Sequence, residues 1–299
     1  MRFNKLSAVM NSNLHRKKVT ENTLKQYRTA CKAFTSYVKE LEGTERVPVE
    51  KYRELAQSYF DYLKSEGKSP DTVHTYAAGI AQGLKMSIDD FKIDRRTRPK
   101  KGRNKPIEAK GNICDIGMVV GIRQDEYKRL KGKHLIERDG HLFVIVRKGK
   151  GGKYQEQLIL PQHEEVVRAL FKGKSDEEYI YTKDETTLFN KANTHAMRRK
   201  VAREAYDYYL GLSKTERAPY IELAHLRFKE NNLKGEKMWQ KEMELIKRSP
   251  NRLCRGVNKK KQLIKEGRKP YFDRECVLLV SVLHLVHYRE DVTVDNYLI

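Results

Sequence analysis

Two arginines, two histidines and a tyrosine between residues 123 and 297 of this 299-residue chain have side chains suited to act together on a phosphodiester. They are Arg123, His195, Arg198, His287 and Tyr297. The planar guanidinium groups suit the non-bridging oxygens of a phosphate, and His287 can add a third hydrogen bond. The ring of His195 can accept the proton of a tyrosine hydroxyl. Each residue is a weak signal alone, because a His-x-x-Arg pair arises by chance roughly once in such a chain.

The order and context of these residues carry more information than the single motifs. The sequence contains Gly121-Ile-Arg-Gln-Asp-Glu126, the glycine-rich turn Gly149-Lys-Gly-Gly-Lys-Tyr154, Thr194-His-Ala-Met-Arg198, Leu285-Val-His287 and Tyr297. In this order the segments resemble the tyrosine recombinase (phage integrase) family. The resemblance covers about residues 112–299, and the glycine-rich turn, the run Ala202–Tyr206 and the spacing from His287 to Tyr297 are similar to bacterial integrases.

The resemblance implies a site-specific DNA recombinase that cleaves and rejoins DNA through a 3′-phosphotyrosine on Tyr297. It implies that Lys150 protonates the leaving 5′ oxygen, and that Glu126 orients a catalytic side chain. Neither a metal nor another cofactor is then required. The implied outcome is integration, excision or resolution of a mobile element such as a phage. The implied partner is double-stranded DNA, bound by a homotetramer that forms from monomers or dimers.

Two residues depart from the family pattern. Arg199 stands where the family usually has histidine, and Val286 stands where it usually has glycine, a residue that permits close backbone packing. Two other assignments stay open: Arg252-Leu-Cys-Arg255 as the second arginine motif, and His284 in place of His287. Arg199 and Val286 favour an alternative function, that of a catalytically inactive DNA-binding transcriptional regulator with a recombinase fold.

The charge of the chain independently predicts a polyanionic partner. The formal net charge is +22, with 62 Lys and Arg against 40 Asp and Glu, and the pI is near 9.7. The excess positive side chains repel one another, and a polyanion such as nucleic acid offsets this repulsion best. A lysine-rich surface without a partner and a nonspecific chromatin- or RNA-binding protein are the alternatives. A nonspecific chromatin- or RNA-binding protein would make the order of the motifs a coincidence.

The apolar runs and the cysteines indicate the cellular compartment of the protein. The longest apolar run, Cys276 to Val286, is about half of the roughly 20 residues that a membrane span needs. No apolar signal segment opens the chain, and the four cysteines are scattered without a metal or disulfide pattern. We therefore expect a cytoplasmic protein with reduced thiols and no membrane contact.

The elements that must position the candidate residues form a mainly α fold with a small three-stranded antiparallel sheet (α+β). A helical core-binding domain is expected over residues 1–94, a basic linker over 95–111 and a catalytic domain over 112–299. Apolar spacing predicts helices at Thr23–Glu40 and Val49–Ser65, a third with Ser69 as its N-cap and Pro70 as its first residue, and further helices at Thr194–Leu210 and Glu275–Val286. Strands are expected at about 134–138, 141–147 and 154–160.

Two basic segments are candidates for DNA contacts. The linker carries Arg95, Arg96, Arg98, Lys100, Lys101, Arg103 and Lys105, and contacts are also expected from Lys148, Lys153 and Arg199. A solvated linker is the alternative. The Lys-rich segment 212–271 lies outside the resemblance and is expected to be an insert that contacts DNA or mediates assembly, or else a surface excursion. Only two residues follow Tyr297, so a C-terminal helix that docks on another protomer is not expected.

Overall fold

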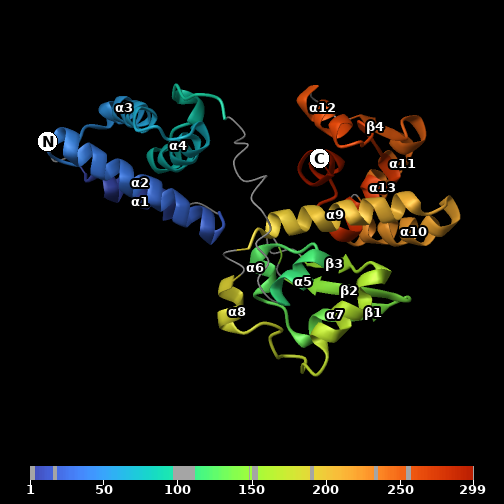
Figure 1. Ribbon diagram of the computed structural model, residues 1–299. Coiled ribbons are helices and arrows are strands. Elements are labelled where there is room, and N and C mark those ends of the chain that lie inside the picture. Colours follow the sequence, from blue (N-terminus) through green and yellow to red (C-terminus); the bar gives the residue numbers. More distant parts are fainter. Residues whose placement is uncertain are drawn as a thin grey trace. The chain divides into compact units, whose positions relative to one another are not determined.

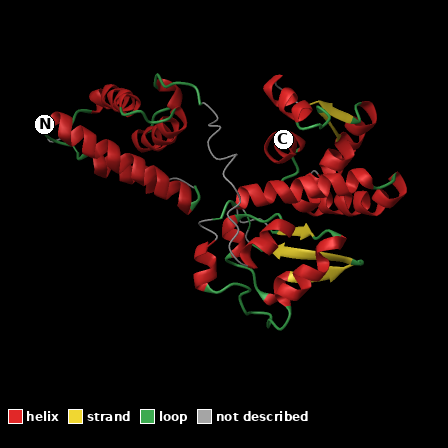
Figure 2. Ribbon diagram, in the orientation of Figure 1, coloured by secondary structure: helices red, strands yellow, loops and turns green. Residues whose placement is uncertain are grey.

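The computed structural model describes residues 4–15, 19–96, 112–147, 149, 154–188, 192–231, 235–253 and 257–298 (Figure 1). The chain divides into two compact units, Met1–Lys101 and Gly102–Ile299. Helices dominate both units, and the second also contains a three-stranded antiparallel sheet (Figure 2). The expected mainly α fold with a small sheet is confirmed. No helix in these ranges is long and apolar enough to cross a membrane.

Four helices are found among the described residues of the N-terminal unit. They are α1 (Leu6–His15), α2 (Glu21–Glu42), α3 (Tyr52–Ser65) and α4 (Pro70–Leu84), with short 3-10 turns at Val49–Lys51 and Ile88–Asp90. The hydroxyl of Ser69 accepts a hydrogen bond from the backbone N–H of Thr72 and so caps α4, whose first residue is proline, as predicted.

Helix α1 is a feature that the sequence prediction missed. Leu6, Met10 and Leu14 recur every four residues and are fully buried in the core of this unit. Helix α4 packs against both α1 and α2 because Gly83 leaves room for them. A Cβ atom at Gly83 would lie 2.8 Å from Met10 Cε and 2.9 Å from Cys31 Sγ. The close contact of three helices therefore depends on the missing side chain.

The sheet of the second unit consists of β1 (Leu135–Arg138), β2 (His141–Val146) and β3 (Gln155–Leu158), in that order and antiparallel. Asp139 and Gly140 both have positive φ angles, of 53° and 73°, which suits the two-residue turn between β1 and β2. The three predicted strands are confirmed, with ends that differ by one or two residues.

The remaining elements of the second unit are mostly helices. They are α5 (Asn112–Val119), α6 (Gln124–Tyr127), α7 (Glu164–Phe171), α8 (Lys183–Leu188), α9 (Thr194–Gly211), α10 (Lys214–Asn231), α11 (Gly235–Arg248), α12 (Val257–Lys265), α13 (Arg274–Leu279), α14 (Glu290–Thr293), the π-helical segments Val280–His284 and Val294–Leu298, and the strand pair β4 (Asn251–Leu253) and β5 (Tyr271–Asp273). The predicted helix 275–286 thus begins as α13 and ends as a π-helical segment at His284, two residues early.

The segment 212–271 is not a surface excursion, and that alternative is wrong. Five of its residues are buried in the same core that holds Tyr297: Tyr220, Ala224, Phe228, Trp239 and Leu263. Arg227 of α10 is 5% exposed and pairs with the buried carboxylate of Glu156 on β3. Helices α10 to α12 therefore complete the core of the second unit.

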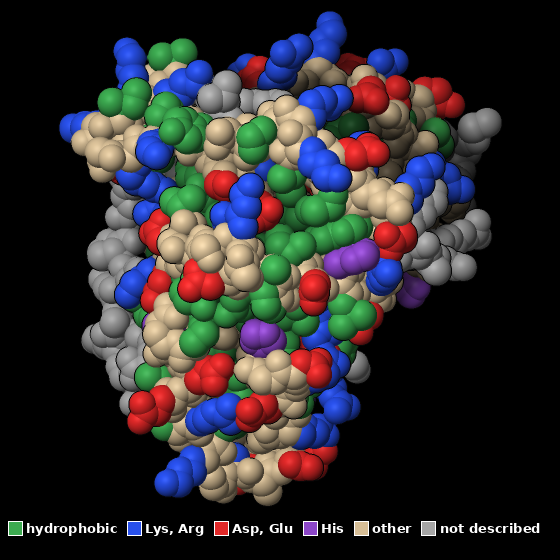
Figure 3. All heavy atoms as spheres, turned by 90° about the vertical axis from the view of Figure 1, so that its right-hand side faces the viewer, with side chains coloured by type: hydrophobic (Ala, Val, Ile, Leu, Met, Phe, Trp, Pro, Cys, Tyr) green, Lys and Arg blue, Asp and Glu red, His purple; other side chains and the backbone are tan. Residues whose placement is uncertain are grey.

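The charge surplus is dispersed over at least one face. Figure 3 shows Lys and Arg side chains mixed with Asp and Glu side chains around an apolar patch on the face that it draws. Many basic residues in the described ranges also have acidic partners, as in the pairs Lys64–Asp94 and Arg168–Glu137. Net charge alone thus does not locate a binding surface.

Candidate active site

Tyr297 lies at the centre of the predicted site. It belongs to the π-helical segment Val294–Leu298 and is 7% exposed. Its ring centroid lies 5.8 Å from that of His195 and 5.6 Å from that of His287, and Arg198 Cζ lies 5.6 Å from it. Helix α9 meets two segments here that follow it by more than 70 residues, the turn after His284 and the last described residues.

The guanidinium of Arg198 is buried and only partly hydrogen-bonded. Arg198 is 1% exposed, and its Nη2 atom donates to the backbone carbonyl of Leu285. Within the described part of the chain, its Nε and Nη1 atoms have no partner. Burial, together with the charge of Arg123, lowers the pKa of Arg198 although Tyr297 acts in the opposite direction. A buried donor without a partner costs about 1–3 kcal/mol, so this site favours an anion.

A short hydrogen-bonded turn holds Arg123. Its backbone N–H donates to Glu126 Oε2 at 2.6 Å, and its Nη1 donates to Glu126 Oε1 at 3.0 Å and to Gln155 Oε1 at 3.4 Å. Glu126 is 4% exposed, and an ionised carboxylate in such a place accepts these bonds strongly. Glu126 is thus placed to orient the Arg123 side chain. The sequence prediction missed Gln155, whose polar side chain is buried in β3.

His287 sits in a turn with an unusual backbone. Val286 and Tyr288 on either side of it have φ angles of +46° and +52°. This left-handed region costs a β-branched residue more than any other kind, and glycine adopts it freely. Val286 therefore takes the backbone conformation of a glycine, and His287 still faces Tyr297.

Ser281 fastens this turn. Its carbonyl accepts from the backbone N–H of His287 at 3.2 Å, and its hydroxyl accepts from that of Arg289 at 2.9 Å. The Ser281 hydroxyl also lies 3.5 Å from His287 Nδ1. No partner for His287 Nε2 is found among the described residues. Burial, reinforced by the nearby Arg198 and Arg123, lowers the pKa of His287 to about 3, so its ring is neutral near pH 7.

His195 opens the site to solvent. It is the second residue of α9, whose first turn is capped by the side chain of Asn193. The residue is exposed, yet partial burial of its ring and the charges of Arg198, Arg199 and Arg123 lower its pKa. A neutral imidazole can accept a proton, which is the role predicted for it. Arg199, half-buried on the same helix, thus acts on the site through its charge.

The two competing assignments do not meet at Tyr297. His284 is 1% exposed; its Nε2 atom lies 2.8 Å from Tyr209 Oη, and its ring also hydrogen-bonds to the Leu158 backbone. Arg252 lies in β4, where Nη1 donates to Glu290 Oε2 at 3.2 Å. Both side chains thus bond to groups other than Tyr297, although Arg252 Nε has no partner among the described residues. Arg255 lies outside the described residues.

The segment 212–271 holds the segment that carries the tyrosine. Lys259 Nζ on α12 lies 3.2 Å from Asp295 Oδ1, and Arg268 Nη2 donates to the Leu298 carbonyl at 2.7 Å. These contacts fall on both sides of Tyr297. The second half of the segment therefore has a positioning role that its basic composition did not indicate.

Several predicted residues fall outside the described ranges. They are Lys150, Lys148, Lys153, Arg98, Lys100, Lys101, Arg103 and Lys105. Arg95 and Arg96 are exposed near the end of the N-terminal unit. A search of the described residues finds no group of three or more His, Cys, Asp or Glu side chains that could hold a metal ion. Cys31 and Cys276 are buried free thiols.

No family model and no curated protein matches the chain. Eleven chains of solved structures match it. One is the Tn1549 transposon integrase (residues 82–397) in complex with circular intermediate DNA, with a TM-score of 0.46 and 13% identity over 71% of this chain and 89% of that one. Another is XerA recombinase, with a TM-score of 0.24 and 17% identity over 70% of this chain and 86% of that one.

Proposed function

We propose that this protein cleaves and rejoins double-stranded DNA through a covalent bond to Tyr297. The observation that carries the proposal is the cluster of Arg198, His195 and His287 around the tyrosine ring. Three buried donor atoms in this cluster, Arg198 Nε, Arg198 Nη1 and His287 Nε2, have no partner among the described residues. A phosphodiester brings the oxygen acceptors that these donors need.

Each residue has its own role in the reaction. Arg198 and Arg123 bind the non-bridging oxygens, and His287 Nε2 donates the third hydrogen bond as the charge on these oxygens grows. His195 accepts the phenolic proton while Tyr297 Oη forms a bond to phosphorus. The bond from phosphorus to the 5′ oxygen breaks, and Lys150 gives that oxygen its proton. Attack by a 5′ hydroxyl on the 3′-phosphotyrosine reverses these steps and rejoins a strand.

The context of the reaction is part of the same proposal. A net charge of +22 supports binding to the phosphate backbone, with an affinity that falls steeply as salt rises. Four protomers on two DNA sites, and integration, excision or resolution of a mobile element, are the outcomes that the resemblance implies. Lys150 and the linker lysines and arginines enter on the sequence alone.

A nicked suicide duplex tests the proposal. Duplexes that the wild-type protein retains are first selected from a random-sequence pool, then nicked so that cleavage releases a short fragment and traps the enzyme. We expect a covalent adduct on a denaturing gel with the wild type and none with Tyr297→Phe. Tyr288→Phe, which alters a neighbouring half-buried tyrosine, is the matched control and should retain the adduct. Bound duplexes without any wild-type adduct would overturn the assignment of catalysis.

The second candidate function is a DNA-binding regulator without strand cleavage. The observation that favours it is Val286, which holds a strained backbone next to a residue that the reaction requires. Such a regulator binds the selected duplexes, and Tyr297→Phe leaves its affinity unchanged. The adduct assay separates the two functions, because only the recombinase becomes covalently attached.

A further inference from the structure

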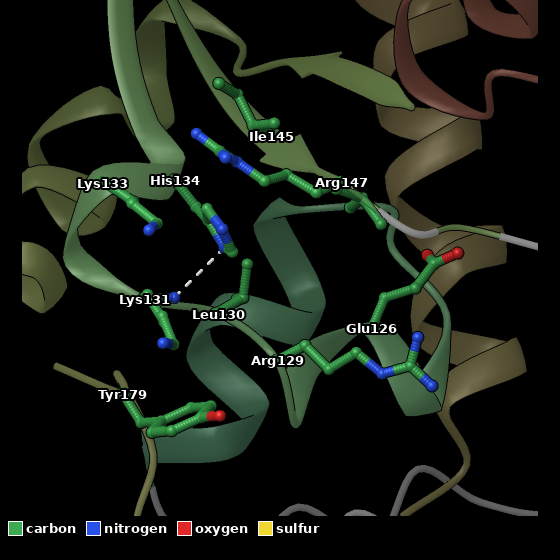
Figure 4. Close-up of a pocket in the computed structure, with 10 residues that line it drawn as sticks. Glu126, Arg129, Leu130, Lys131, Lys133, His134, Ile145, Arg147 and Tyr179 are labelled. Carbon is green, nitrogen blue, oxygen red and sulfur yellow. Dashed lines mark hydrogen bonds between the residues drawn. The ribbon is translucent and has the colours of Figure 1, made fainter. Parts of the chain in front are cut away.

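A pocket of about 340 Å³ in the second unit lies next to the candidate site and shares one residue with it. It is lined by Glu126, Arg129, Leu130, Lys131, Lys133, His134, Ile145, Val146, Arg147 and Tyr179 (Figure 4). Its floor is apolar, and four of its ten residues are Lys or Arg. Of these ten, only Glu126 was a site residue in the sequence prediction, so the pocket needs an explanation of its own.

Two lysines of this pocket converge on one carboxylate. Lys131 Nζ lies 2.8 Å from Glu177 Oε2, and Lys133 Nζ pairs with the other oxygen of the same group. The lysine side chains are 24% and 27% exposed, whereas that of Glu177 is 67% exposed. Lys131 Nζ also lies 4.8 Å from the centroid of the Tyr179 ring. Two half-buried cations therefore surround a single anion position, which an exposed and replaceable group now fills.

His134 adds a hydrogen-bond donor to the pocket. It is 6% exposed, and the backbone N–H of Lys131 donates to its Nδ1 atom at 3.2 Å. Since a backbone N–H can only donate, Nδ1 carries no hydrogen and the hydrogen of the neutral ring is on Nε2. Burial, together with Arg147, Lys133 and Lys131, lowers the pKa of His134 and keeps the ring neutral. Nε2 has no hydrogen-bond partner in the described ranges.

We propose that this pocket binds a phosphate of the DNA backbone, beside the phosphate held by Arg123, with the Glu177 carboxylate displaced. The proposal rests on DNA being the partner in the proposed function. A phosphodiester offers two charged oxygens to Lys131 and Lys133, as the carboxylate does, and a further acceptor to His134 Nε2. Figure 4 shows the Arg147 side chain reaching across the pocket toward His134, where its charge adds to that of the lysines.

The apolar floor fits the same ligand. Leu130, Ile145 and Val146 are buried residues whose side chains can pack against deoxyribose. Glu126 joins the pocket to the candidate site, because the residue lines the pocket and its carboxylate holds Arg123. The pocket and the site then hold two phosphates of one duplex, which fixes the position of the strand to be cleaved.

Charge variants with opposite expected signs test this proposal on the full-length protein. Equilibrium binding to a selected duplex is measured over a range of salt. Lys131→Gln combined with Lys133→Gln should weaken binding about fivefold and reduce the slope of log K against log salt by about 0.9, the value for one lost phosphate contact. Glu177→Gln should tighten binding about threefold, because the competing carboxylate is gone.

The neighbouring pair Lys174 and Glu178 supplies matched controls. These two residues form an exposed ion pair outside the pocket, three residues before and one residue after Glu177. Glu178→Gln makes the same charge change as Glu177→Gln, and Lys174→Gln removes one of the two charges that the double lysine variant removes. We expect each control to alter affinity less than twofold. Equal effects in the pocket and the control pair would refute the pocket and leave the proposed function intact.

His134→Phe separates the pocket from general charge effects. It removes the Nε2 donor without changing net charge, so affinity should fall about threefold with an unchanged salt slope. Thermal unfolding of each variant confirms that it is folded. Titration of the wild type with inorganic phosphate distinguishes the source of the anion. Stabilisation by millimolar phosphate, with no effect of the variants on duplex binding, would assign the pocket to free phosphate instead.

Discussion

His284 should make the second unit sensitive to mild acid. Its ring is fully buried and hydrogen-bonds to Tyr209 Oη and to the Leu158 backbone. In this setting burial lowers the pKa of His284 from 6.5 to about 3, and only the neutral ring is accommodated. The unfolded chain takes up a proton below pH 6.5 that the folded chain refuses. Stability is therefore complete above pH 6.5 and is lost as the pH falls toward 3.

The magnitude follows from the size of the pKa shift. Each pH unit below 6.5 costs about 1.4 kcal/mol for such a group, so at pH 5 His284 removes about 2 kcal/mol of unfolding free energy. His287, whose pKa is also about 3, adds a similar loss. The two together remove roughly 4 kcal/mol between pH 6.5 and pH 5, a large part of the usual stability of a domain.

Urea unfolding followed by tryptophan emission wavelength measures this loss. Trp239 is the single tryptophan of the chain and is buried in the second unit, so its emission reports on that unit alone. His284→Gln keeps a donor and an acceptor but does not titrate, and it should reduce the loss between pH 6.5 and 5 by about 2 kcal/mol. His74→Gln, at a half-buried position in the N-terminal unit, is the control and should leave the Trp239 signal unchanged. A wild-type loss identical to that of His284→Gln would refute the reasoning.

Three further variants test other contacts of the second unit. Arg227→Met leaves the buried carboxylate of Glu156 short of one partner and should lower unfolding free energy by about 3 kcal/mol in urea titrations. Phe228→Ala opens a cavity in the core and should cost about 3–5 kcal/mol in the same assay, whereas a true surface excursion would lose almost nothing. Lys259→Ala should slow adduct formation about tenfold while DNA affinity stays unchanged. Lys260→Ala, its exposed neighbour, should show the wild-type rate.

Much of the fold follows from local patterns in the sequence. Helices such as α3 and α4 have apolar residues at helical spacing and recognisable end signals, and β1 and β2 flank an Asp-Gly turn. The strand pair β4 and β5 was missed because each strand has three residues, too few for a period to emerge. Helices α10 to α12 were misjudged because their apolar residues are sparse among many charges.

The candidate site likewise contains some residues that the sequence predicts and others that it does not. Arg123, Arg198, His195 and Tyr297 belong to short motifs whose chemistry can be read from residue type and order. Gln155 and Ser281 carry no motif, because their importance comes from which atoms the fold brings within 3.5 Å of the arginine and histidine side chains. The pairing of Glu177 with two lysines about 45 positions away belongs to the same class. Long-range contacts of this kind leave no periodic trace in the sequence.

The contacts that hold the last described segment in place indicate which subunit would cut which DNA strand. Lys259 and Arg268 belong to the same chain as Tyr297 and hold its segment from both sides. Lending the tyrosine to a neighbouring protomer would break both contacts and withdraw Leu298, which is fully buried, from the core. Under the proposed function, each subunit in this conformation therefore attacks the DNA that it binds itself. Exchange of tyrosines between subunits would require the core of the donor to open.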